Sequence, residues 1–241
     1  MRFIYCIYQL FICLPLFLLM TIYTALATTI GCTLGNGDYW SYIPPRRWSR
    51  FICKILFLPV KVEGMEKLDP KQSYVFVSNH QGIFDIWLIY GYLGRNFKWM
   101  MKKELEKIPL VGMACKKANH IYVDRGNTAK MKQTYDFARK ILSSGMSLCV
   151  FPEGTRTKTG KMGVFKRGAF VLAEDIKLPI VPLTINGSFK VLPSTKGITF
   201  VRRHQLTLTI HEPIPYDETK TLKEMMDESS RVIESDVCAE Q

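Results

Sequence analysis

Residues 3–37 carry no charged side chain, and this stretch limits what the chain can fold into more than any other feature. Large apolar residues dominate it, and a helix needs only ~20 of them to cross a bilayer. The small residues 25–27 suggest a cleaved signal peptide, but the apolar stretch is too long and only Arg2 precedes it. We therefore expect the segment to remain attached and to embed the protein in a membrane.

Two modes of embedding remain open for this segment. A single helix could span the bilayer. Alternatively, a helix or a helical pair could lie within one leaflet, because Pro15 and the polar groups of residues 21–29 interrupt the apolar run.

Residues 46–57 interleave basic and bulky apolar side chains, which is typical of an interfacial helix on an anionic membrane face. An amphipathic helix packed on the core could have the same composition, but the preceding apolar segment favours the interfacial interpretation. The basic cluster outweighs Arg2, so residues 46 onward are expected on the cytoplasmic side. These observations predict a membrane anchor with an interfacial helix at residues 1–58 and a folded domain at residues 59–241.

The net charge of +12 arises from 33 basic and 21 acidic residues, and the whole excess lies in residues 46–241. Such a charge favours anionic partners: nucleic acid, an anionic membrane face or phosphorylated ligands. No helix-turn-helix, zinc-finger or RNP-type motif supports a nucleic-acid partner. The seven cysteines include no C-x-x-C pair, which favours free thiols and predicts no metal site.

From about residue 60, short apolar runs alternate with helical patterns, which predicts an α/β fold with a largely parallel sheet flanked by helices. The predicted strands are Tyr74–Ser78, Asn119–Val123, Ser147–Phe151, Ile180–Ile185 and Gln205–Ile210. The predicted helices are Phe84–Tyr92, one through Met131 and Leu142 with Asn127 as its N-cap, one opened by Phe165–Ala169, and one from Leu222 to Ile233.

The first chemical signal is His80, which follows a predicted strand, with Asp85 five residues later. Two residues five apart on one helix point about 140° away from each other, given 3.6 residues per turn. The two side chains can therefore meet only if His80 precedes the helix and Asp85 lies in its first turn, and Gly82 would ease such a loop. Asp85 would then orient the imidazole as a general base. A histidine that merely caps or packs beneath the helix is the structural alternative.

A second group of polar residues follows the strand Ser147–Phe151. Here Glu153 could hydrogen-bond acceptor hydroxyls and Arg156 could bind a phosphate bidentately. Lys102 and Lys103 add further cations, and Arg125 follows the predicted strand Asn119–Val123. Each cation alone fits a solvated surface, but several of them beside a histidine indicate an anion pocket.

Five ordered blocks of this chain resemble those of the glycerolipid acyltransferase family, whose best-known member type is 1-acyl-sn-glycerol-3-phosphate acyltransferase. The resemblance covers residues from about 60 to 215. The blocks are Asn79-His80-x-x-x-x-Asp85, Lys102-Lys103-Glu104-Leu105, Val123-Asp124-Arg125, Phe151-Pro152-Glu153-Gly154-Thr155-Arg156 and Leu178-Pro179-Ile180-Val181-Pro182.

The resemblance implies transfer of a fatty acyl chain from acyl-CoA or acyl-carrier protein to the sn-2 hydroxyl of lysophosphatidic acid, giving phosphatidic acid. His80 would be the base and Asp85 its orienting partner, without an acyl-enzyme, a cofactor or a metal. The residues implied in substrate binding are Asn79, Lys102, Lys103, Arg125, Glu153, Gly154, Thr155 and Arg156. The implied partners are membrane lipid, the lysophospholipid acceptor and the thioester donor, and the expected location is the cytoplasmic face of a bacterial inner membrane.

Several alternatives remain. Another acceptor, such as a lyso-aminolipid or glycerol 3-phosphate, would use the same catalytic block. A non-catalytic lipid-binding protein could keep the fold. A serine or cysteine hydrolase is disfavoured because no G-x-S-x-G occurs and Cys149 lies within a predicted strand. A nucleic-acid binder rests on charge alone.

Overall fold

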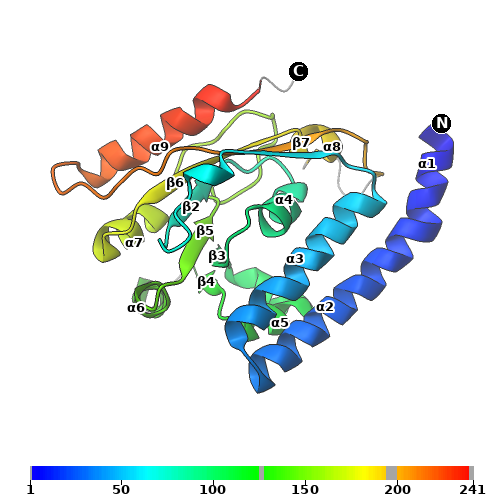
Figure 1. The fold of residues 1–241 in the computed structure, drawn as a ribbon, viewed down its shortest axis with the longest axis horizontal. Helices are drawn as coiled ribbons and strands as arrows, with labels where there is room; N and C mark the ends of the chain where they lie inside the picture. Colours follow the sequence, from blue (N-terminus) through cyan, green and yellow to red (C-terminus); the bar gives the residue numbers. More distant parts are fainter. Residues whose placement is uncertain (1, 125–127, 194–199, 239–241) are drawn as a thin grey trace.

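The computed structural model describes residues 2–124, 128–193 and 200–238. Within them, one sheet of seven strands has the order β1-β7-β6-β2-β5-β3-β4 (Figure 1). The strands are β1 (Val60–Glu63), β2 (Val75–Ser78), β3 (Phe97–Lys102), β4 (Ile121–Val123), β5 (Ser147–Val150), β6 (Ile180–Asn186) and β7 (Leu206–Ile210). Strands β6, β2, β5, β3 and β4 are mutually parallel, whereas β7 pairs antiparallel with β6. The predicted α/β fold with a largely parallel sheet is confirmed.

Helices cover both faces of this sheet. On one side lie α6 (Thr128–Ser143), α7 (Gly168–Ile176) and α9 (Leu222–Asp236), and on the other lie α4 (Phe84–Tyr92), α5 (Val111–Lys117) and α3 (Gly37–Ile55) (Figure 1). The short α8 (Ser188–Val191) follows β6, and single 3-10 turns occupy Met65–Lys67 and Lys103–Lys107. The predicted helix Phe84–Tyr92 is confirmed at both ends, and the predicted N-cap Asn127 lies outside the described residues.

Two strands, β1 and β3, were not predicted. Lysines interrupt their apolar patterns, and the clearest case is Lys98 within β3. This side chain is nonetheless only 4% exposed, because its ammonium group donates to Ser41 Oγ at 2.8 Å. A buried cation with a tertiary partner cannot be distinguished from a surface lysine by local pattern alone.

The N-terminal segment forms one continuous helix, built from α1 (Arg2–Tyr8), a π-helical turn (Gln9–Cys13) and α2 (Leu14–Leu34). It runs antiparallel along α3 as the outermost layer (Figure 1). Contacts occur along its whole length: Tyr5 Oη donates to the carbonyl of Leu56 at 2.6 Å, and Trp48 Nε1 donates to Thr21 Oγ1 at 3.1 Å. The two helices therefore form a hairpin with α3 on the inside.

The hairpin turn depends on glycine and asparagine. Asn36 caps α3, because its side chain accepts from the backbone N–H groups of Asp38 and Tyr39. Near the end of α2, Trp40 lies so close to Gly31 that a Cβ atom there would come within 2.1 Å of the indole ring. Only glycine allows this approach.

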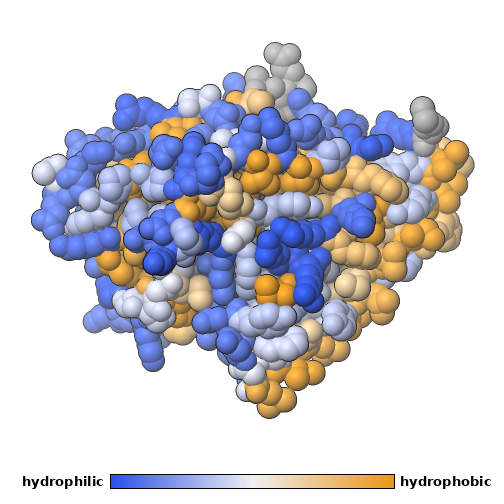
Figure 2. All heavy atoms as spheres, viewed as in Figure 1, coloured by the Kyte–Doolittle hydropathy of each residue, from blue (hydrophilic) through white to orange (hydrophobic). Residues whose placement is uncertain are grey.

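The outward face of the N-terminal helix is apolar over its full length (Figure 2). Its exposed large apolar side chains are Phe3, Ile4, Ile7, Leu10, Phe11, Ile12, Leu14, Leu18, Leu19, Ile22, Tyr23, Leu26, Ile30 and Leu34. By length and composition, Arg2–Leu34 is a helix that could cross a membrane. A continuous exposed apolar face of this size marks an interaction surface.

Helix α3 packs on the core of the domain and also exposes a basic side. Ile52 and Cys53 are almost fully buried in the core shared with β2 and α4, as expected for a helix packed on the domain. Arg47, Arg50 and Lys54 lie on its exposed side. The predicted boundary after residue 58 falls between α3 and β1, although α3 contributes to the core of the domain.

Candidate active site

The carboxyl ends of five parallel strands meet at one edge of the sheet, which is where ligands bind in open α/β folds. The pairing of Val77 with Val150, and of Met100 with Val150, places the ends of β2, β5 and β3 side by side. The segments that follow these strands contain most of the predicted site residues. The topology thus brings the His80 block, the Glu153 block and the Lys102 block together.

His80 and Asp85 are in direct contact. His80 Nδ1 lies 2.6 Å from Asp85 Oδ2, and the same oxygen accepts from the backbone N–H groups of Gln81 (2.6 Å) and Gly82 (2.8 Å). As predicted, His80 precedes α4 and Asp85 lies in its first turn. Gly82 has an ordinary negative φ, so the expected need for backbone freedom there is wrong. Glycine is required instead because a Cβ atom would lie 2.7 Å from Ser188 Oγ.

The contacts of the Asp85 carboxylate determine which nitrogen of the His80 ring can accept a proton. A carboxylate is an acceptor, so Nδ1 must carry the proton in this pair. The other nitrogen, Nε2, then has a free lone pair, and it has no hydrogen-bond partner in the described part of the chain. Asp85 is fully buried, whereas the side chain of His80 is 13% exposed. The arrangement thus presents one basic nitrogen toward the open side of the site.

The ring of His80 is held from its face by Phe151. The two ring centroids are 3.9 Å apart with an interplanar angle of 8°, and Phe151 in turn stacks on Trp99 at 5.4 Å and 24°. One aromatic stack thereby joins the residues that follow β2 and β5 to Trp99 within β3. Asp85 fixes the imidazole at its edge and Phe151 at its face, so the ring has little freedom to rotate.

Glu153 has a structural position that the sequence did not predict. Its Oε1 accepts from the backbone N–H of His80 at 2.7 Å, and its Oε2 accepts from the N–H of Gly163 at 2.7 Å. The residue is only 8% exposed, and burial raises the pKa of its carboxyl group. Both oxygens are therefore occupied in joining two loops. The expectation that Glu153 also binds acceptor hydroxyls stays a prediction.

Asn79 also connects two strands, and its predicted role in substrate binding stays a prediction. Its side-chain amide donates to the carbonyl of Ile185 and accepts from the N–H of the same residue, both at 2.8 Å. It is 1% exposed, so it ties the end of β2 to β6. Gly154 adopts a positive φ of 72°, which makes the turn after Glu153 possible, and Thr155 is exposed beside it.

The cations that were predicted to bind substrate differ in whether they are exposed and in whether a side chain of the protein pairs with them. Lys102, at the end of β3, and Arg156 are exposed, and no side chain in the described ranges pairs with either. Lys103 Nζ lies 3.3 Å from Asp124 Oδ2, so its charge is partly neutralised. Arg125 lies outside the described residues. Lys102 and Arg156 are consequently the two cations best placed to meet an anionic group.

A series of buried hydrogen bonds connects Trp99, the last ring of the aromatic stack, to helix α3. His120 Nδ1 accepts from the backbone N–H of Trp99 at 3.1 Å, which leaves its Nε2–H to face the Tyr90 hydroxyl at 3.1 Å. Tyr90 Oη then donates to the carbonyl of Ser41 at 3.1 Å. Burial lowers the pKa of His120 to about 3, with a contribution from the charge of Lys98. His120 is therefore a neutral structural link.

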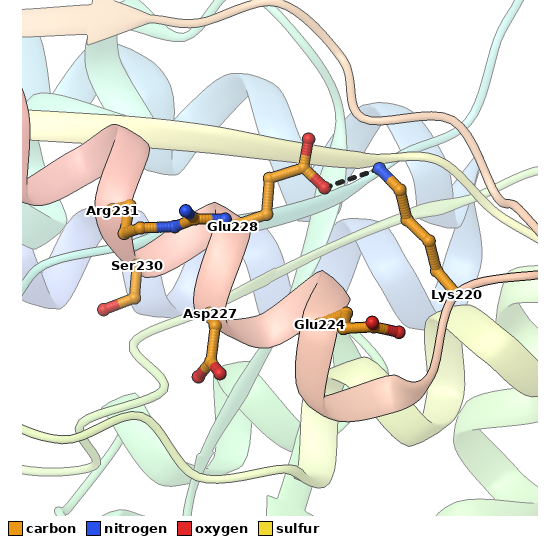
Figure 3. A pocket seen from close by; sticks show the side chains of 6 residues that line it. All are labelled: Lys220, Glu224, Asp227, Glu228, Ser230 and Arg231. Carbon is orange, nitrogen blue, oxygen red and sulfur yellow. Dashed lines mark hydrogen bonds and ion pairs between the residues drawn. The ribbon is translucent and has the colours of Figure 1, made fainter.

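A shallow hollow on the outer side of α9 is unrelated to this edge. It is lined by polar and charged residues, and its Lys220 and Glu228 side chains form an ion pair of 2.7 Å (Figure 3). None of the residues predicted to bind substrate lines it. The strand edge remains the candidate site.

Comparison with known proteins agrees with this geometry. The sequence model of the acyltransferase family matches residues 59–186, which span β1 to β6 and include both the His80 and Glu153 blocks. The chain belongs to the acyltransferase family. Its similarity to 1-acyl-sn-glycerol-3-phosphate acyltransferases is confirmed by two curated relatives and a solved structure.

The chloroplastic 1-acyl-sn-glycerol-3-phosphate acyltransferase of Arabidopsis thaliana is 32% identical over 178 residues, covering 70% of this chain and 49% of that protein. The human 1-acyl-sn-glycerol-3-phosphate acyltransferase alpha is 38% identical over 128 residues, covering 53% of this chain and 45% of that protein. The chain thus spans about half the length of these relatives. The crystal structure of the 1-acyl-sn-glycerophosphate acyltransferase PlsC from Thermotoga maritima superposes with a TM-score of 0.73 at 25% identity, covering 91% of this chain and 94% of that one.

Three contacts in the candidate site of this acyltransferase were not predicted from the sequence. The stacking role of Phe151 was not predicted, although the residue stands at the head of the Glu153 block. The contact of Glu153 with Gly163 and the close approach of Ser188 to Gly82 were also missed. These pairs are distant in sequence, and no local pattern indicates them.

Proposed function

We propose that the protein transfers a fatty acyl chain from an acyl thioester to the sn-2 hydroxyl of lysophosphatidic acid, producing phosphatidic acid. The observation that carries the proposal is the His80–Asp85 contact of 2.6 Å at the carboxyl edge of a sheet in a chain of this family. The names of its relatives, which are 1-acyl-sn-glycerol-3-phosphate acyltransferases, support the choice of acceptor. Lys102 and Arg156 at the same edge also support it, because no side chain among the described residues pairs with them.

In the proposed reaction, His80 Nε2 removes the proton of the acceptor hydroxyl as its oxygen attacks the thioester carbonyl. The tetrahedral intermediate then collapses, the carbon–sulfur bond breaks, and the proton passes from His80 to the departing thiolate. Asp85 stabilises the imidazolium that forms between these two steps. General-base catalysis of this kind contributes ~10²–10⁴-fold, and much of the remainder comes from holding two substrates together.

Lys102 and Arg156 are proposed to bind the phosphate of the acceptor. An exposed guanidinium can bind a phosphate bidentately, and a lysine adds a second charge. Lys102 ends β3 and Arg156 follows β5, and both strands lie on the same side of β2, the strand that leads into His80. A phosphate held there leaves the adjacent glycerol hydroxyl to reach the base.

The N-terminal hairpin is proposed to lie within one leaflet. Its outer helix, at about 1.5 Å per residue, is roughly 50 Å long, which exceeds the ~30 Å hydrocarbon core. Helix α3 runs antiparallel beside it with Arg47, Arg50 and Lys54 exposed. If the outer helix crossed the bilayer, these cations would enter it at a cost of ~2.5–3.5 kcal/mol each at the centre. A hairpin lying in the interface keeps them in the headgroup layer. The cytoplasmic face and the bacterial inner membrane remain predictions.

The test is acyl transfer by the full chain purified in detergent, with a panel of lysolipids and glycerol 3-phosphate as acceptors, beside His80→Ala. We expect transfer to lysophosphatidate that is lost in the variant. Transfer only to a lyso-aminolipid or to glycerol 3-phosphate would keep the mechanism and replace the acceptor. Activity that is absent with every acceptor, or equal in His80→Ala, would refute the proposal and favour a lipid-binding role.

The donor is tested in the same assay by supplying acyl-CoA and acyl-carrier protein separately at equal concentration. Both carry the same thioester, so the His80 chemistry is common to them. A difference in kcat/KM identifies the donor that the protein prefers, while loss of both activities in His80→Ala ties each to the same base.

A further inference from the structure

A groove with a volume of about 560 Å³ lies where the first turns of the N-terminal helix meet the segment that leads into β7. It is separate from the proposed catalytic edge, and its composition is unusual. Three arginines and three aromatic residues line it: Arg2, Arg202, Arg203, Tyr5, Phe57 and Phe200. Cations and exposed rings on a shared concave surface suit a ligand with an anionic head and an apolar body.

The groove has a defined structure, because the segment that carries Arg202 and Arg203 is hydrogen-bonded to the N-terminal helix. Gln9 is only 7% exposed, and its side-chain amide both donates to the carbonyl of Val201 at 2.9 Å and accepts from the N–H of Val201 at 2.8 Å. The next residue, Arg202, donates its backbone N–H to the carbonyl of Val191 at 2.9 Å. The arginines are thus carried on a segment that is fixed from both sides.

Gln9 begins the π-helical turn of the N-terminal helix. A π-turn changes the phase of a helix and is frequently found at functional sites. Here the altered turn contains the buried amide that holds Val201. The interruption of the α-helix therefore coincides with the contact that builds the groove.

Among the described residues, no acidic side chain neutralises the charges of the groove. Arg2, Arg202 and Arg203 are exposed, and no acidic side chain in the described ranges pairs with any of them. The neighbouring stretch 194–199 contains no acidic residue in its sequence. The groove consequently carries an unbalanced positive charge that favours an anion.

The apolar part of the groove points to a lipid and not to a free anion. Phe57 is 54% exposed and adopts a left-handed φ of 51°, and its ring packs 5.6 Å from that of Tyr8. Phe200, which also lines the groove, is 49% exposed. Beside this groove, the N-terminal helix exposes large apolar side chains from Phe3 to Leu34. An inorganic anion would use the arginines but leave these rings in water.

We propose that this groove binds the headgroup of an anionic phospholipid from the surrounding bilayer. The phosphate would lie against Arg202 and Arg203, with Arg2 at the rim, and the acyl chains would follow the apolar face of the helix. Because Arg202 is bonded to Val191, and α8 begins at Ser188 beside the Gly82 loop, a lipid bound here would fix the catalytic edge close to the membrane surface.

The test is native mass spectrometry of the detergent-purified full chain with added phosphatidylglycerol or phosphatidylcholine. Phosphatidylglycerol is neither the acceptor nor the product of the proposed reaction, so retention of it reports on a separate site. We expect the protein to retain phosphatidylglycerol in preference to phosphatidylcholine. Replacing two arginines by Arg202→Ala and Arg203→Ala should weaken that retention about tenfold or more.

The matched control replaces two exposed cations on α9, Lys223→Ala and Arg231→Ala, which changes the net charge equally and should retain the lipid. Equal loss in both double variants would show that only overall charge matters and would overturn the site. Retention lost in Lys102→Ala with Arg156→Ala, but kept in Arg202→Ala with Arg203→Ala, would place the lipid at the catalytic edge and also overturn it. Full displacement of the lipid by millimolar inorganic phosphate would refute a lipid site in favour of an anion site.

Because binding is measured without turnover, this result is independent of the proposed reaction. The double variant Arg202→Ala with Arg203→Ala should also keep its acyl-transfer activity in detergent without anionic lipid. A protein without any acyl transfer that still retained phosphatidylglycerol would refute the proposed function and leave the lipid site intact.

Discussion

The imidazole of His80 lies face to face with the ring of Phe151, 3.9 Å between centroids and 8° from parallel. Asp85 already fixes the edge of the imidazole, but a carboxylate at the edge does not prevent the ring plane from tilting. The phenyl ring of Phe151 supplies this restraint. The positions of the other site residues lead to further expectations.

Removing the Phe151 ring should impair the proposed turnover more than binding. In Phe151→Leu the apolar volume is roughly kept but the stack is lost, so His80 becomes free to tilt. We expect kcat to fall about tenfold or more, with little change in KM, because small misplacements of a catalytic group are costly. Phe151→Tyr retains the stack and should stay close to the unmodified protein. If Phe151→Leu and Phe151→Tyr were equally active, the stacking would have no positioning role.

Asp85→Asn should abolish most of the activity while leaving the fold largely intact. An asparagine can donate to Nδ1, which would favour the wrong tautomer and protonate Nε2. It also accepts less strongly from the N–H groups of Gln81 and Gly82. We expect kcat to fall by about 10²–10⁴-fold. Circular dichroism should be unchanged, and a variant that unfolds instead would assign Asp85 a mainly structural role.

Glu153→Gln should destabilise the protein, because a carboxamide has only one oxygen to accept two backbone N–H groups. One of the two contacts, to His80 or to Gly163, would be replaced by two facing donors. A buried donor left without an acceptor costs about 1–3 kcal/mol. We expect a lower Tm, together with lower activity, since the His80 loop loses its anchor. The exposed Glu66→Gln is the control and should change neither; a normal Tm in Glu153→Gln would contradict the connecting role.

His120 predicts a specific dependence of stability on pH. Burial lowers the pKa of His120 to about 3 from an ordinary value of 6.5, so the unfolded chain binds a proton over this interval that the folded protein does not. The free energy of unfolding should therefore fall as the pH falls below 6.5, by up to about 1.4 kcal/mol per pH unit from this residue. Above pH 6.5 the residue contributes no pH dependence.

The measurement is Tm against pH for the unmodified protein and for His120→Gln, which has no titrating group at this position. The variant should be less stable at neutral pH and should lose less stability on acidification. His204→Gln, at an exposed histidine, is the control and should reproduce the unmodified profile. Parallel profiles for His120→Gln and the unmodified protein would show that His120 is not held neutral.

Gly31→Ala should weaken the N-terminal hairpin. A Cβ atom at this position would come within 2.1 Å of the Trp40 ring, so the two helices would have to separate or the indole would have to move. Overpacking of this kind costs about 1–3 kcal/mol, which corresponds to a Tm reduced by roughly 2–4 °C per kcal/mol in a chain of this size. Gly37→Ala, where a Cβ would meet nothing within 4 Å, should leave the Tm unchanged.

A Gly31→Ala protein as stable as the control would mean that Trp40 accommodates the methyl group, and that the close approach does not hold the hairpin together. Thermal unfolding of both variants in the same detergent distinguishes these outcomes.

Local pattern was sufficient to predict the architecture and the central pair of the site. An uncharged apolar stretch predicts a membrane-embedded helix from its own composition, without reference to the rest of the fold. Alternating strand and helix patterns predict a parallel sheet. The relation of His80 to Asp85 was also accessible, because the two residues are five apart and the geometry of a helix start limits how they can meet. The resemblance to the family then suggested the proposed acceptor and the proposed thioester donors, which the fold alone does not specify.

Tertiary structure decided what the other polar residues contact. Glu153 and Asn79 have the residue types of substrate ligands, yet their side chains are buried against backbone groups of distant segments. The strand β3 was hidden in sequence because Lys98 finds a partner in Ser41, 57 residues away. Residue type determines what a side chain can bond to, but only the packing of the sheet determines whether the nearest partner is the protein itself or a substrate.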